Sequence, residues 1–198
     1  MRELSLNVMD VVQNSITAGA TLIRIRIEEH LQKEALLISI EDNGIGMTDE
    51  QMKSVKDPFY TTRTTRNVGL GVPLFKMEAE MTGGSFEIFS KYGEGTSVTA
   101  LFQTDSIDMI PLGDIDGIVH LLVTCNPEID FCYEMKTMPE DLAYIQLDTR
   151  EIRQLLGDEI LLNMPQVVQW LKEYLFEQRQ QYEGSRAERD RGIDPMPD

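Results

Sequence analysis

The spacing of polar residues at the start of the chain predicts a helix over residues 3–16. Four acid or amide side chains recur there at intervals of three or four residues, so they share one narrow face of such a helix. Most of the remaining positions are apolar, so we expect the helix to be buried and its polar stripe to face a polar partner. The stripe consists of Glu3, Asn7, Asp10 and Asn14.

Alternating apolar and polar residues predict strands elsewhere in the first hundred residues. Residues 57–67 show no periodicity and hold four threonines, two arginines and a proline, which predicts a long loop of the kind that often carries function. The order of elements predicts an α+β fold, with a mixed sheet backed by helices. The strands are expected at 21–27, 35–41, 85–90 and 96–102, and the further helices at 48–55 and 73–81.

The pattern changes after residue 104. Residues 184–198 are charged, aperiodic and contain proline and glycine, which is typical of disorder. We therefore expect a first domain over 1–104, a small α/β module over 105–183 and a disordered tail over 184–198. The module is predicted to hold helices at 115–124, 149–157 and 165–181 and strands at 129–135 and 142–147.

Composition narrows the class of protein. Hydrophobic residues make up 41% and charged residues 26%, which is ordinary for a soluble globular protein. The chain has no run of about 18 apolar residues, so we expect no membrane span. The acid in the opening Met-Arg-Glu-Leu-Ser does not suit a signal peptide, and two cysteines fit a reducing compartment. These features predict a cytoplasmic protein.

The net charge of −16 argues against nucleic acid as the main partner, because neutralising phosphates needs a basic surface. It does not exclude a small anion such as a nucleotide. A nucleotide needs only a local pocket of backbone N–H groups and a metal ion. If a nucleotide binds, we expect a divalent cation to bind with it.

Two glycine motifs are candidates for such a pocket. In Asp42-x-Gly44-x-Gly46 the glycines let the backbone approach a ligand, and the acid could accept a hydrogen bond from an exocyclic amine. A plain turn would use the same residues. A calcium loop is a weaker alternative, because Ser39 replaces the usual first aspartate and a strand precedes it. Gly69-Leu70-Gly71 precedes a helix, where it forms either an anion site or a capping turn.

The order of the motifs is more specific than any one of them. In this order the chain resembles the Bergerat-fold (GHKL) ATPase family, which includes histidine kinases, anti-sigma-factor kinases, type II topoisomerases, Hsp90 and mismatch-repair ATPases. The resemblance covers about residues 3–103 and implies a Bergerat-type α/β sandwich to which the small C-terminal module is attached. It is carried by Asn14, Asp42-x-Gly44-x-Gly46, Pro58-Phe-Tyr-Thr-Thr-Arg63, Gly69-Leu70-Gly71 and Gly93-x-Gly95-Thr96.

The resemblance implies binding of ATP with Mg²⁺. Asn14 would coordinate the metal, and Asp42 would bind the adenine amine directly and through a water shared with Thr96. Gly44 and Gly46 would admit the adenine. Residues 57–68 would form a mobile lid, and the glycines before the next helix would cradle phosphates. The full implied set adds Met47, Thr61, Thr62, Arg63, Gly69, Leu70 and Gly71 to these residues.

Asp10 is the candidate catalytic residue. It lies one turn before Asn14, where histidine kinases usually have Asn and topoisomerase-type ATPases and anti-sigma serine kinases usually have Glu as general base. Asp10 keeps the carboxylate but is one methylene shorter. Its role as general base, as support for Mg²⁺ or as a structural residue is left open.

Two further departures from histidine kinases are Asn67, which stands where many kinases have the first glycine of the Gly-x-Gly-Leu-Gly run, and the position of the phosphoacceptor. Their phosphoacceptor histidine lies upstream of this domain, and we expect no such segment before residue 3. Neither His30 nor His120 is expected to take its place. The first hypothesis is therefore a stand-alone signalling kinase that phosphorylates a separate protein. The second is a nucleotide-gated protein-binding module or a weak ATPase, and a homodimer is compatible with either.

Overall fold

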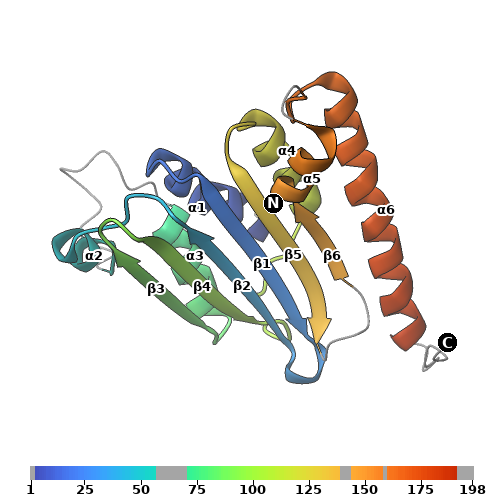
Figure 1. The fold of residues 1–198 in the computed structure, drawn as a ribbon. Helices are drawn as coiled ribbons and strands as arrows, with labels where there is room; N and C mark the ends of the chain where they lie inside the picture. Colours follow the sequence, from blue (N-terminus) through green and yellow to red (C-terminus); the bar gives the residue numbers. More distant parts are fainter. Residues whose placement is uncertain (1–2, 57–70, 139–143, 158–159, 191–198) are drawn as a thin grey trace.

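A six-stranded mixed sheet forms the centre of the computed structural model, which describes residues 3–56, 71–138, 144–157 and 160–190. The strands lie in the order β3-β4-β2-β1-β5-β6 (Figure 1). Their bounds are β1 Leu22–His30, β2 Ala35–Asp42, β3 Ser85–Lys91, β4 Gly95–Gln103, β5 Asp130–Met138 and β6 Tyr144–Asp148.

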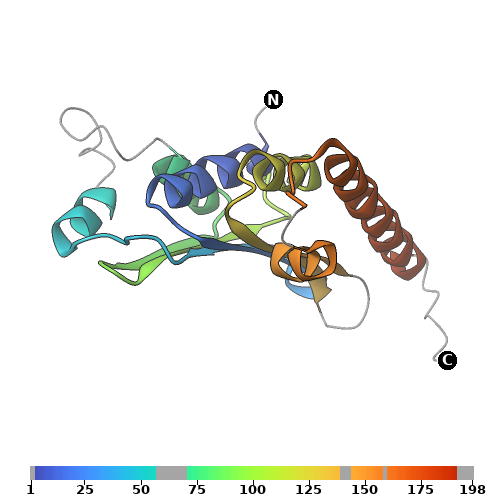
Figure 2. The ribbon, with the colours of Figure 1, turned by 45° about the horizontal axis from the view of Figure 1, so that its top comes forward.

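Three helices lie side by side over one face of this sheet. Figure 2 shows α1, α3 and α4 together on that face, with α5 on the opposite side and α6 beside the β6 edge. Among the described residues, no helix is long and apolar enough to cross a membrane. The bounds are α1 Leu4–Thr17, α2 Asp49–Lys56, α3 Gly71–Met81, α4 Ile115–Cys125, α5 Thr149–Leu156 and α6 Pro165–Asp190, with a short 3₁₀ helix at Leu31–Lys33.

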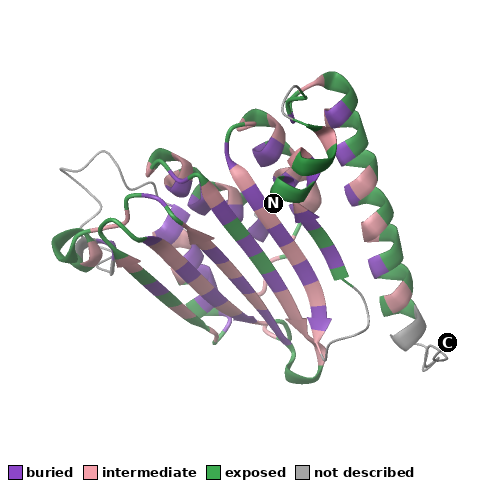
Figure 3. Cartoon of the chain, viewed as in Figure 1, coloured by how far each residue is buried: buried purple, intermediate pink, exposed green. Residues whose placement is uncertain are grey.

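Alternation along the strands explains why one face is covered. In β1, Ile23, Ile25 and Ile27 are buried beneath the helices, whereas Arg24 and Arg26 are exposed on the other face (Figure 3). The sheet is antiparallel except for the β1–β5 pair, which is parallel. The predicted α+β class, a mixed sheet backed by helices, is confirmed.

The first helix is less buried than its sequence suggests. Leu4, Val8 and Val12 are buried on the side that faces the sheet, but Leu6 is 44% exposed and Asp10 is exposed beside it. The expectation of a helix buried nearly all round is wrong. Because a single layer of helices covers the sheet, the outward side of α1 remains in solvent.

The strands beyond residue 104 extend the same sheet. Leu22 of β1 pairs with Asp130 of β5, so sheet pairing crosses the predicted boundary at residue 104. The division into 1–104 and 105–183 stays a prediction about the organisation of the chain.

The last helix continues past the predicted start of the tail, through Asp190. Its end is anchored because the Tyr182 hydroxyl donates to Glu29 at 2.7 Å and Arg186 donates to the same carboxylate at 3.2 Å. Residues 184–190 are therefore helical, and 191–198 lie outside the described residues.

The segment after β4 holds the start of α1. No side chain caps this helix at Glu3. Instead the Leu4 N–H donates to the Pro111 carbonyl at 3.0 Å, and the Ser5 N–H donates to the Leu112 carbonyl at 2.8 Å. Two of the four N–H groups that a helix start leaves unpaired are thus satisfied by the main chain more than a hundred residues later.

Candidate functional site

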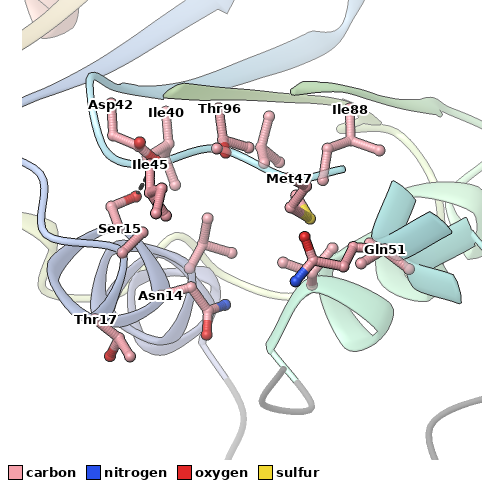
Figure 4. A pocket seen from close by; sticks show the side chains of 16 residues that line it. Asn14, Ser15, Thr17, Ile40, Asp42, Ile45, Met47, Gln51, Ile88 and Thr96 are labelled. Atoms are coloured by element: carbon pink, nitrogen blue, oxygen red, sulfur yellow. Dashed lines mark hydrogen bonds between the residues drawn. The ribbon is translucent and has the colours of Figure 1, made fainter. Parts of the chain in front are cut away.

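A cavity of about 210 Å³ lies between α1, α2 and the covered face of strands β2, β3 and β4 (Figure 4). Ile40, Ile88 and Val98 form its apolar sheet side. A mostly apolar pocket with a few convergent polar groups is the usual form of a small-molecule site. The polar side chains in its lining are Asn14, Ser15, Thr17, Asp42, Gln51 and Thr96.

The cavity brings together residues from several predicted motifs. Gly46 and Met47 line it alongside the predicted polar residues Asn14, Asp42 and Thr96. Gly44 contributes through its main chain, and Gly71 begins α3. The other predicted residues, Thr61, Thr62, Arg63, Gly69 and Leu70, lie outside the described residues.

Asp42 is held in one orientation at the end of β2. The Ser15 hydroxyl donates to Asp42 Oδ2 at 2.6 Å (Figure 4). The Gly44 N–H donates to Asp42 Oδ1 at 2.8 Å. A carboxylate has about four acceptor positions, so these two bonds leave capacity for a ligand. Asp42 is therefore a preorganised acceptor on the cavity wall.

The sequence interpretation did not single out Ser15. It is 4% exposed and lies directly after Asn14 on α1. A buried hydroxyl needs a hydrogen-bond partner, and this requirement could have indicated a polar neighbour. The identity of that neighbour could not be inferred, because Ser15 and Asp42 meet only in the folded chain.

The loop after β2 packs closely against the β3–β4 hairpin. Gly46 has a φ of +66°, and a Cβ there would lie 2.1 Å from the Lys91 carbonyl oxygen. The contact is fixed by two hydrogen bonds, from the Gly93 N–H to the Ile45 carbonyl at 2.7 Å and from the Met47 N–H to Ser90 Oγ at 2.8 Å. Only glycine combines this conformation with this approach.

The hydrogen bonds of Ser90 determine whether the Thr96 hydroxyl acts as a donor or as an acceptor toward the cavity. The Ser90 hydroxyl donates to the Gly95 carbonyl at 2.9 Å and accepts from Met47. It also lies 2.9 Å from the Thr96 hydroxyl. Because a hydroxyl has one proton to donate, Thr96 is the donor in this pair. The Thr96 oxygen therefore meets a ligand or water in the cavity as an acceptor.

The polar stripe of α1 divides into different environments. Asn7 is buried and donates to Glu78 on α3, so its partner is a protein side chain. Asn14 lines the cavity. Asp10, one turn earlier, is exposed beside the start of α3, where a Cβ on Gly71 would lie 2.6 Å from the Asp10 Cβ.

The oxygen ligands at this end of α1 fit magnesium. Mg²⁺ prefers hard oxygen ligands and is usually bound by one or two carboxylates together with substrate phosphates. The Asp10 carboxylate and the Asn14 amide oxygen are of this kind. Within the described ranges, no group of three or more His, Cys, Asp or Glu side chains is arranged to hold a metal by itself. A magnesium ion would therefore need oxygens from a ligand.

Comparison with known proteins gives a family match over the first half of the chain. Residues 2–106 match the family described as "Histidine kinase-, DNA gyrase B-, and HSP90-like ATPase". This segment contains the cavity and all the predicted site residues.

Individual relatives match over the same part. The chain is 32% identical over 106 residues to Sporulation kinase B of Bacillus subtilis (strain 168), covering 52% of this chain and 24% of that protein. It is 30% identical over 111 residues to Sensor protein kinase FleS of Pseudomonas aeruginosa, covering 56% and 26%. The match thus spans about a quarter of the length of these relatives.

One solved structure resembles a larger part of the chain. The N-terminal domain of a DNA repair protein superposes with a TM-score of 0.52 and 15% sequence identity, covering 80% of this chain and 58% of that one. At this identity the likeness concerns the fold alone. Its coverage exceeds the matched family segment, so the shared fold includes part of the chain after residue 106.

Proposed function

Because the chain belongs to the family of histidine kinase-, DNA gyrase B- and HSP90-like ATPases, we propose that it binds ATP with Mg²⁺ in the cytoplasm and phosphorylates a separate signalling protein. In this proposal it works as a stand-alone kinase, in the manner of histidine kinases and anti-sigma-factor serine kinases. One observation carries it: Asp10 and Asn14 lie one turn apart on α1, and Asn14 lines a cavity whose sheet side presents a fixed Asp42.

The adenine would occupy the inner cavity. The fixed Asp42 carboxylate would accept a hydrogen bond from the exocyclic amine, and Thr96 would accept one from a water shared with Asp42. Ile40, Ile88 and Val98 supply an apolar wall for the ring. Guanine presents a carbonyl oxygen where adenine presents an amine, so this arrangement favours ATP over GTP.

The phosphates would lie toward the N-terminus of α3. The exposed N–H groups of a helix start favour anions, and Gly71 opens α3 directly beside Asp10. We propose that Gly69, Leu70 and Gly71 contact the phosphates together with Thr61, Thr62 and Arg63. A magnesium ion held by Asn14 and the phosphate oxygens would offset their negative charge during transfer.

Asp10 is proposed as the general base. Among the described residues, no hydrogen bond or ion pair occupies its carboxylate, and the side chain is exposed where an acceptor hydroxyl or a water could reach it. A base must first be within reach of the proton that it removes. Support of Mg²⁺ is the competing role, because the same carboxylate is one turn from Asn14.

The acceptor is proposed to lie on another protein. The sequence contains two histidines. His120 Nε2 lies 2.9 Å from the Val168 carbonyl oxygen, and His30 lies 3.4 Å from Glu28. His30 also lies at the opposite end of β1 from Asp42, since it pairs with Ala35. Neither histidine is placed to receive phosphate from a nucleotide in the cavity.

A nucleotide-gated binding module is the second candidate. Gln51 and Val55 on α2 and Val72 on α3 line the cavity, and these helices flank residues 57–70 on both sides. A nucleotide would therefore contact the elements before and after that segment. Its binding could change a partner surface there without phosphate transfer.

The test measures binding and transfer separately. Purified wild-type protein, Asp10→Asn and the control Asp108→Asn, an exposed acid outside the cavity lining, are titrated with ATP and Mg²⁺ by calorimetry. Each is then incubated with γ-labelled ATP and a host-cell protein fraction. We expect all three to bind ATP, and the wild type and Asp108→Asn to label a second protein that Asp10→Asn does not label.

Other outcomes distinguish the candidates. Binding by all three proteins without label on any second protein supports the gated module. Equal labelling by Asp10→Asn and the wild type removes Asp10 from the base role. Absence of ATP binding by the wild type contradicts both functions.

A further inference from the structure

The two edge strands of the sheet differ in whether their outer backbone groups have a partner. At β6 a side chain bonds these groups. Gln178 on α6 accepts from the Gln146 N–H at 2.9 Å and donates to the Gln146 carbonyl at 3.0 Å. The side-chain amide thereby bonds the outer main chain of β6 as a neighbouring strand would. Unpaired edge strands invite pairing with other chains, and this contact prevents it at β6.

The β3 edge is open by comparison. β3 pairs with β4 on one side, and no other described strand pairs with it (Figure 1). Its residues on the face away from the helices are Ser85, Glu87, Phe89 and Lys91, and all are exposed. Phe89, in the middle, is 68% exposed. A large aromatic side chain at the centre of an open edge strand marks a site for strand pairing.

We propose that β3 pairs antiparallel with β3 of a second copy of this chain, in the register centred on Phe89. This register sets Phe89 opposite the partner's Phe89. It also sets Glu87 opposite the partner's Lys91, and Lys91 opposite the partner's Glu87. Residues directly opposite on an antiparallel pair have neighbouring side chains, so both charged pairs are favourable.

The alternative registers lack this complementarity. Centring the pair on Glu87 or on Lys91 places like charges opposite each other. A shift of the register by one residue changes which residues lie opposite each other. Glu87 then no longer faces the partner's Lys91, and both charged pairs are lost. A parallel, in-register pair also sets like charges side by side. The charge pattern of β3 therefore specifies one arrangement.

The two charges are not matched within a single chain. Glu87 and Lys91 lie four positions apart along the strand, a span of about 13 Å. Lys91 Nζ does form an ion pair with Glu94 in the following turn, and both side chains are largely exposed. An exposed pair of this kind contributes little, so Lys91 can exchange it for a partner across the interface.

The proposed pairing ends at a dimer. A twofold axis uses the same edge on both copies, and the β6 edge of each copy is closed by Gln178. The result is one continuous sheet through two chains. The interface is small by the standards of stable complexes, so we expect weak, concentration-dependent association. Ile88 of β3 lines the cavity, but its side chain is buried on the opposite face of the strand from Glu87, Phe89 and Lys91. The proposed pairing therefore holds whether or not the proposed function is right.

Charge exchange tests the register. Sedimentation velocity over a concentration series is measured for the wild type, Lys91→Glu, Glu87→Lys and the double exchange. Each single change makes both cross-strand pairs like-charged, so we expect the dimer dissociation constant to rise about tenfold or more. The double exchange restores opposite charges and should return association close to the wild-type level. Glu94→Lys is the control, because it removes the Lys91–Glu94 pair and leaves the register intact.

The outcomes are decisive in both directions. Weaker association of both single variants, recovery by the double exchange and an unchanged Glu94→Lys support the proposal. A wild type that stays monomeric up to about 1 mM overturns it, as does a double exchange that fails to recover. A dissociation constant of Glu94→Lys that rises as much as those of the single variants also overturns it. Circular dichroism and thermal unfolding of each variant verify that the fold is kept.

Discussion

Replacing Gly46 with alanine tests whether the close approach of the loop to the hairpin forms the cavity. The new Cβ would lie 2.1 Å from the Lys91 carbonyl oxygen. An ordinary carbon–oxygen contact needs about 3.3 Å, so the loop and the hairpin would have to separate by about 1 Å. The φ of +66° at Gly46 adds a conformational cost for any residue with a side chain.

The magnitude follows from these two effects. The left-handed conformation costs about 1–2 kcal/mol for alanine. Separation weakens the Gly93–Ile45 and Met47–Ser90 hydrogen bonds, each worth about 1 kcal/mol. We expect Gly46→Ala to lower the free energy of unfolding by about 3–4 kcal/mol. Affinity for ATP should fall as well, because Gly46 and Met47 line the cavity.

Gly93→Ala is the matched control. Gly93 also has a positive φ, +82°, but a Cβ there meets no atom within 4 Å. It should therefore incur only the conformational cost of about 1–2 kcal/mol and keep its nucleotide affinity. Urea unfolding followed by circular dichroism and titration calorimetry with ATP measure both quantities.

The steric reasoning would be refuted by equal losses of stability in the two variants. It would also be refuted if Gly46→Ala bound ATP as tightly as the wild type. In the first case the conformational cost alone would explain the loss of stability. In the second case the close approach to Lys91 would have no role in forming the nucleotide site.

Two further predictions concern hydroxyl groups. Ser15→Ala removes the 2.6 Å bond to Asp42, and we expect ATP affinity to fall about fivefold with reduced discrimination against GTP, measured by competitive titration; unchanged discrimination would contradict a positioning role for Ser15. Burial raises the pKa of Tyr182 above its usual value near 10, so its contribution to stability is complete below pH 10 and is lost as pH rises further. Tyr182→Phe should be less stable at pH 8, having lost its bond to Glu29, but should lose less stability than the wild type between pH 8 and pH 11 in urea unfolding. A parallel decline of both proteins would refute this.

The local elements and the mixed α+β sheet were predictable because they depend on short-range patterns. The alternation of apolar and polar residues in β1 predicts a strand, and the glycines after β2 predict a turn. Motif order brought Asn14, Asp42 and Thr96 into one predicted site, and the structure places these three around one cavity.

The contacts that orient the site were not predictable. Ser15 and Ser90 are small hydroxyl residues without a distinctive pattern, and their partners are distant in sequence. The partner of Asn7 is a side chain on α3, because the packing of the two helices and not their periodicity decides which polar groups meet. The extension of α6 depends on Glu29 in β1, more than a hundred residues away.

The parallel pairing of β1 with β5 affects how the chain folds during its synthesis on the ribosome. Leu22 meets Asp130 only after about two-thirds of the chain has been synthesised. Until then β1 is the outer strand of an incomplete sheet, because the backbone groups that pair with β5 have no partner strand. Such late, long-range pairing slows folding and exposes a surface prone to aggregation. A fragment ending at residue 106 would never form the β1–β5 pair. It would also lack the carbonyls of Pro111 and Leu112 that bind the first N–H groups of α1.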